Sequence, residues 1–176
     1  MKITKIEKLA NKLVKAFTYN KTINPIPLEY TKSMKNAEKL RRLCESKVKQ
    51  PIDGFKAAGT GIAVLKKLGE KTPFYASVFK NNILKSGRSV KINTYTLGIE
   101  LEVGYLIKKN FFQSKSSINF MNIHKYISHM MAAIEVVGYR QKKKGIKFLG
   151  DLCSDFGANV KFVTGKKCKY RKVNFE

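Results

Sequence analysis

Two glutamates occupy alternate positions of an apolar run, Gly98-Ile-Glu-Leu-Glu-Val-Gly-Tyr105. Acids are scarce in this chain, whose 176 residues include 36 Lys and Arg but 12 Asp and Glu. The run alternates and contains β-branched residues, which predicts a strand in which positions i and i+2 face the same way. We therefore expect Glu100 and Glu102 to project together from one face, and the apolar residues between them to line the other.

Two carboxylates this close repel each other, and each raises the pKa of the other unless a cation lies between them. A hard divalent cation such as Mg²⁺ or Mn²⁺ suits oxygen ligands. From the spacing alone, a solvated edge strand with two surface glutamates is the simpler interpretation. The metal hypothesis therefore depends on the rest of the chain.

Three further segments carry candidate residues. The apolar segment Ala133-Ile-Glu-Val-Val-Gly-Tyr-Arg140 predicts a second strand with one glutamate, Glu135. Upstream, Asp53-Gly-Phe-Lys-Ala-Ala-Gly59 places Lys56 in a short apolar segment between glycines. Downstream, the segment 154–165 predicts a turn that leads into a strand.

Together and in this order, the segments resemble the 2-keto-4-pentenoate hydratase and decarboxylase family of the fumarylacetoacetate hydrolase superfamily. The family pattern is a Trp-Lys-Ile-Gly-like strand, then Gly-Val/Ile-Glu-x-Glu, then Ile-Glu-Val-Val followed by Arg. An Asp-Asn-Ala-Ser/Cys segment ending in Val-x-Gly comes next. The resemblance covers about Asp53 to Gly165. It implies an α+β fold in which N-terminal helices cap a mixed, curled β-sheet of the fumarylacetoacetate hydrolase-like type, incomplete at the C-terminus.

The resemblance also implies a site and a reaction. Glu100, Glu102 and Glu135 would hold Mg²⁺ or Mn²⁺, Lys56 would act in catalysis, and Arg140 would bind the substrate anion. The expected reaction adds water to a 2-hydroxypenta-2,4-dienoate-type 2-oxo acid through a metal-chelated enolate. Decarboxylation of an unsaturated 2-oxo diacid would use the same enolate and stays open as a second reaction.

Three departures from the family pattern leave more than one interpretation of the chain open. Phe74 replaces an aspartate, and Phe156 and Ala158 replace the Asn and Ser of the Asp-Asn-Ala-Ser segment. Family members also continue well beyond Gly165. The chain could therefore be an active hydratase that forms a homo-oligomer or is completed by a partner chain. It could instead be an inactive fragment or a binding protein that keeps the scaffold.

Hydrophobic periodicity predicts the organisation of the chain. We expect residues 1–50 to form a helical cap and residues 51–176 a mixed-sheet domain of catalytic type, within one structural domain. The predicted helices are Ile3–Phe17, Thr31–Lys49, Gly61–Leu68 and Asn122–Met131, and the predicted strands after the Lys56 segment are Ala76–Leu84, Ser89–Ile92, Thr96–Lys108 and the Glu135 strand.

The formal net charge of +24 attracts nucleic acid without any specific site. The excess is nearly all lysine and is spread along the chain, with no zinc-finger or RNP-like motif. We therefore expect no specific nucleic-acid partner and consider a basic nucleic-acid-binding protein the less favoured alternative. The sequence has no apolar run of about 20 residues and no signal-peptide core, and its three cysteines have no metal-ligand spacing. These features predict a cytoplasmic protein without membrane contact.

Overall fold

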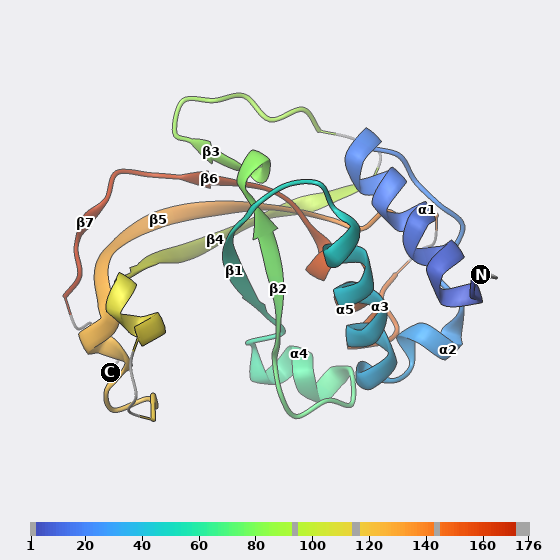
Figure 1. Ribbon diagram of the computed structural model, residues 1–176, viewed down its shortest axis with the longest axis horizontal. Coiled ribbons are helices and arrows are strands. Elements are labelled where there is room, and N and C mark those ends of the chain that lie inside the picture. Colours follow the sequence, from blue (N-terminus) through green and yellow to red (C-terminus); the bar gives the residue numbers. More distant parts are fainter. Residues whose placement is uncertain (1–2, 93–94, 114–116, 143–144, 172–176) are drawn as a thin grey trace.

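The computed structural model describes residues 3–92, 95–113, 117–142 and 145–171. Helices gather at one side of the molecule and long strands cross the other (Figure 1). The helices are α1 (Lys5–Tyr19), α2 (Leu28–Thr31), α3 (Met34–Lys47), α4 (Ile62–Lys67) and α5 (Leu149–Ser154), and short 3-10 turns cover Lys80–Asn82, Lys109–Gln113, Ile123–Tyr126 and Phe156–Ala158. The strands are β1 (Ile52–Ala58), β2 (Phe74–Phe79), β3 (Ile83–Lys85), β4 (Thr96–Ile107), β5 (Ile127–Gly138), β6 (Asn159–Thr164) and β7 (Cys168–Lys169).

Helix α1 begins at a capping box, because the Thr4 side chain accepts from the Glu7 backbone and the Glu7 carboxylate accepts from the Thr4 backbone. Its buried side chains recur at helical spacing, and they include Leu13 and Phe17. Phe17 stacks on Phe156 at a ring-centroid distance of 4.4 Å. The helices and the sheet region therefore share one core, which crosses the predicted boundary at residue 50.

The large sheet has the order β3-β6-β5-β4, with β7 also paired to β5. Strands β3 and β6 are parallel, whereas β4, β5 and β6 pair antiparallel. The long strands β4 and β5 curve as they cross the molecule (Figure 1). The predicted α+β class with a mixed sheet is confirmed.

A second, two-stranded sheet consists of the antiparallel pair β1 and β2. The sequence predicted one continuous strand over Ala76–Leu84. This prediction is wrong, because the middle of the segment is a turn. The turn Lys80–Asn82 separates β2 from β3, and these two strands join different sheets. A polar Lys-Asn-Asn turn interrupts the apolar pattern there, because its side chains suit a turn better than a paired strand.

Two other local predictions are also wrong. Residues 89–92 form no strand. The predicted helix Asn122–Met131 is a single 3-10 turn followed by β5, which begins at Ile127. Met130 and Met131 pair with Tyr105 and Gly104 of β4, so strand pairing overrides the local helical pattern.

Strand β4 is exposed along nearly its whole length, and among the described residues it pairs with β5 alone. Ile99, Leu101 and Val103 face away from the glutamates, as predicted. This apolar face consists of Ile99, Leu101, Val103 and Tyr105 of β4 and Ile134 of β5, all exposed. None of the helices in the described ranges is both long and apolar enough to span a bilayer.

Candidate metal centre

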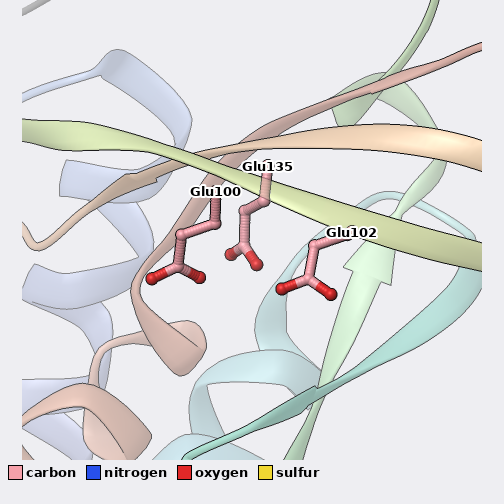
Figure 2. Close-up of side chains that lie close together, drawn as sticks. All are labelled: Glu100, Glu102 and Glu135. Carbon is pink, nitrogen blue, oxygen red and sulfur yellow. The ribbon is translucent and has the colours of Figure 1, made fainter. Parts of the chain in front are cut away.

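Strand register brings the three predicted glutamates onto one face. Glu100 of β4 lies directly opposite Glu135 of β5, and Glu102 follows two residues later on the same side of β4. Figure 2 shows the three carboxylates on the same side of the two strands. The sequence motifs could place Glu100 and Glu102 together, whereas the position of Glu135 depended on the register between two distant strands.

The three carboxylates could hold a metal ion. One oxygen of each lies within 4.8 Å of the others. Glu135 is buried, with 1% of its surface exposed, whereas Glu100 and Glu102 are exposed. All three donors are oxygen atoms, and two of the three glutamates are exposed to solvent. This arrangement fits a hard divalent cation that keeps coordination positions free for water or another ligand.

Lys56 reaches this cluster from the second sheet. Its Nζ atom lies 2.5 Å from Oε1 of Glu135 and 3.2 Å from the carbonyl oxygen of Gly157. The lysine side chain is 9% exposed. The family resemblance predicted Lys56 beside the glutamates, and the position of strand β1 brings Lys56 to Glu135.

The electrostatics of the cluster follow from its burial. Loss of water raises the pKa of the Glu135 carboxyl to about 7, although the Lys56 ammonium acts to lower it. The nearby Glu100 and Glu102 carboxylates raise it further. A negative cluster of this kind is stabilised by added positive charge, and Lys56 supplies part of it.

Arg140, the predicted anion-binding residue, is buried and engaged elsewhere. Its guanidinium is 3.0 Å from the Asp155 carboxylate and donates to the Asn159 carbonyl oxygen at 2.9 Å. Its backbone N–H also donates to Asp155. The guanidinium carbon lies 4.9 Å from the ring centre of Phe17. Its predicted role in substrate binding stays untested, and these contacts favour a structural role.

The departures from the family pattern are apolar core positions. Phe74, Phe156 and Ala158 are buried, and Phe156 packs between Phe17 and Phe79. The sequence alone indicated only that these three residues replace polar residues of the family pattern, and it did not predict their place in the core. The carbonyl of Gly157 was missed as a partner of Lys56, because a backbone acceptor leaves no signal in residue type.

No protein-family model matches the chain, and no curated protein matches it. Two solved structures of 4-oxalocrotonate decarboxylase from Pseudomonas putida G7 are similar in fold. The complex with calcium and acetate superposes with a TM-score of 0.77 at 16% identity, and the complex with magnesium and adipate with 0.73 at 15%. Each match covers 96% of this chain, and this chain spans 65% of the length of each decarboxylase chain. At this identity the likeness establishes the fold.

Proposed function

We propose that this protein is a metal-dependent lyase acting on a 2-oxo acid, and that it adds water to a 2-hydroxypenta-2,4-dienoate-type substrate. The observation that carries the proposal is the convergence of Glu100, Glu102 and Glu135 on one face, with Lys56 against Glu135. Support comes from the fold, which is similar to that of a decarboxylase solved with calcium or magnesium and a carboxylic acid.

Decarboxylation is the second candidate reaction, because both similar structures are those of a 4-oxalocrotonate decarboxylase. The two candidates share one set of protein groups. They differ in the substrate that fits the site, so the same variants test both.

In this proposal Glu100, Glu102 and Glu135 hold Mg²⁺ or Mn²⁺. The bound cation would act as a Lewis acid that stabilises negative charge on substrate oxygens. The exposed Glu100 and Glu102 leave one side of the site open to solvent, so a small anion can approach there. The buried Glu135 fixes the opposite side, because its strand lies in the middle of the sheet.

Lys56 has two roles in the proposal. Three carboxylates outnumber the charge of one divalent cation, so the ammonium offsets the excess that would repel an anionic substrate. A lysine beside the reacting atoms can also donate a proton as the ammonium or accept one as the neutral amine. Both roles need Lys56 close to Glu135, and its Nζ atom lies 2.5 Å from that carboxylate. Arg140, which was predicted to bind the substrate anion, has no such role in this proposal, because its guanidinium is held by Asp155 and Asn159.

We also propose that the protein forms a homo-oligomer in which a second copy covers the apolar face. Contiguous apolar patches of more than a few hundred Å² are uncommon on monomers. Leu101, at the centre of the face, is 84% exposed, and Ile99 is 67% exposed. The five residues that define the face are uncharged, so two copies can pack there despite the net charge of +24.

The test is an assay of both reactions with Mg²⁺ and Mn²⁺ added. We expect Lys56→Ala and Glu102→Gln to abolish turnover, while Lys67→Ala and Glu38→Gln keep it. Lys67 is exposed on α4 and Glu38 is half-buried on α3, and neither belongs to the cluster, so their variants match the changes in charge. Equal activity in wild type and Lys56→Ala would contradict the role of the lysine. A wild type that binds metal but turns over neither substrate class would contradict the enzyme proposal.

A further inference from the structure

Three consecutive residues, Phe156, Gly157 and Ala158, have left-handed backbone angles, with φ of 54°, 69° and 59°. Such angles are unfavourable for a residue that carries a Cβ atom, because the Cβ atom then crowds the following carbonyl oxygen. Two of these three residues carry one, so this short turn is strained and requires support from its surroundings.

The support comes from buried polar groups on both sides of the turn. The Asn159 side chain donates to the Phe156 carbonyl oxygen at 2.6 Å and to the Ser77 carbonyl oxygen at 3.4 Å. Arg140 holds Asp155, the residue before the turn, and the Asn159 backbone after it. Asp155 and Asn159 are fully buried.

The turn packs directly against the Lys56 side chain. A Cβ atom at Gly157 would lie 2.6 Å from the Cβ of Ala76 and 3.7 Å from Cδ of Lys56. Ala76 is the register partner of Lys56 across the β1–β2 pair. Gly157 therefore lies in close contact with the β1–β2 pair, and its carbonyl oxygen accepts from Lys56 Nζ at 3.2 Å.

We propose that Gly157 is the positioning residue for Lys56: the clamped left-handed turn presents its carbonyl oxygen to the lysine ammonium and so holds that ammonium against Glu135. The inference rests on the proposed function for the catalytic importance of Lys56. The placement of its ammonium by Gly157 can be tested without that function. A lysine stem has many rotamers, and a second acceptor from another segment fixes one of them. Only a residue without a Cβ atom fits the turn at this distance from Ala76.

The experiment measures how strongly Lys56 is protected from reductive methylation in the metal-free protein. Peptide mass spectrometry gives the rate at Lys56 relative to exposed Lys67 in the same sample. We expect slow modification of Lys56 in wild type and a rate roughly tenfold higher in Gly157→Ala, as for loss of a hydrogen bond to a charged group. The double variant Gly157→Ala/Ala76→Gly removes the collision and should restore much of the protection.

Asn159→Ala provides a second route, because it frees the turn without adding an atom. It should raise the rate at Lys56 in the same direction, and it decides the question if Gly157→Ala does not fold. An unchanged Lys56 rate in either folded variant would overturn the proposal. Mn²⁺ binding by wild type is measured in parallel, so a failed metal proposal is distinguished from a failed positioning proposal.

Discussion

Glu100 and Glu135 are direct register partners on the antiparallel strands β4 and β5. One carboxylate is exposed on an edge strand and the other is buried against Lys56. The pair therefore joins a solvent-accessible oxygen donor to one held in a fixed place. This combination suits a site that must both fix a cation and admit a ligand.

The buried carboxyl of Glu135 should make the stability of metal-free protein depend on pH. Its folded-state pKa is raised to about 7 from 4.5, so the folded protein holds this proton more tightly than the unfolded chain. The stability that the protonated Glu135 carboxyl contributes is fully present below its unfolded-state pKa of 4.5, and it is lost as the pH rises through about 7. We expect wild type to lose stability relative to Glu135→Gln between about pH 5 and about pH 8. Urea unfolding of both proteins in EDTA measures the difference, and a difference that does not change with pH would contradict this assignment.

Lys56 and Glu135 should be energetically coupled. Lys56→Met leaves a buried carboxyl without its cation, which costs about 3 kcal/mol at pH above 7. The double variant Lys56→Met/Glu135→Gln removes both charges, so most of that stability should return. Denaturant unfolding of the four proteins gives the coupling energy. Lys67→Met, on an exposed face of α4, serves as the control. If the losses of unfolding free energy in the two single variants add up to the loss in the double variant, the contact contributes no coupling energy.

The ion pair of Arg140 with Asp155 should contribute far more to the unfolding free energy than the ion pair of Arg42 with Glu38. Arg140 and Asp155 are both buried, and removing either partner should cost about 3–5 kcal/mol of unfolding free energy. Arg42 and Glu38 lie 3.9 Å apart with exposed side chains, so Arg42→Ala should have little effect. A small loss in Arg140→Ala would mean that the guanidinium does not brace the turn before β6.

The sequence predicted which acidic side chains lie together better than it predicted the elements around them. Alternation in β4 identified Glu100 and Glu102 as neighbours, because side-chain direction in a strand depends on local geometry alone. The approach of Glu135 and Lys56 depends on register and on the packing of two sheets. Local spacing does not encode these, and the family resemblance supplied them instead.

The misplaced elements have physical causes. The segment that begins at Ile127 carries a weak helical pattern, but its backbone finds partners in β4 and becomes a strand. The turn at Lys80–Asn82 redirects the chain from one sheet to the other, and its three polar residues were the available signal. The left-handed turn before β6 was expected as a turn, but the strained angles of Phe156 and Ala158 are imposed by the buried groups around them.

Self-association should depend on the apolar face. Leu101→Lys places a charge at its centre, where a second copy would have to desolvate it. We expect wild type to form an oligomer by size-exclusion chromatography with light scattering, and Leu101→Lys to shift it toward monomer. Lys67→Glu provides a control for a charge change outside the face. A monomeric wild type at high concentration would contradict the oligomer proposal.

Binding of Mn²⁺, followed by titration calorimetry or by the electron paramagnetic resonance of the free ion, shows whether the three glutamates form a metal centre. We expect one site in wild type. We also expect affinity lower by more than roughly tenfold in Glu102→Gln and Glu135→Gln, since even outer partners of a metal are worth that much. Glu38→Gln, which removes an acid on α3 outside the three-glutamate cluster, should bind as wild type does. Absence of binding in wild type, or equal affinity in wild type and Glu135→Gln, would contradict a metal centre built from Glu100, Glu102 and Glu135.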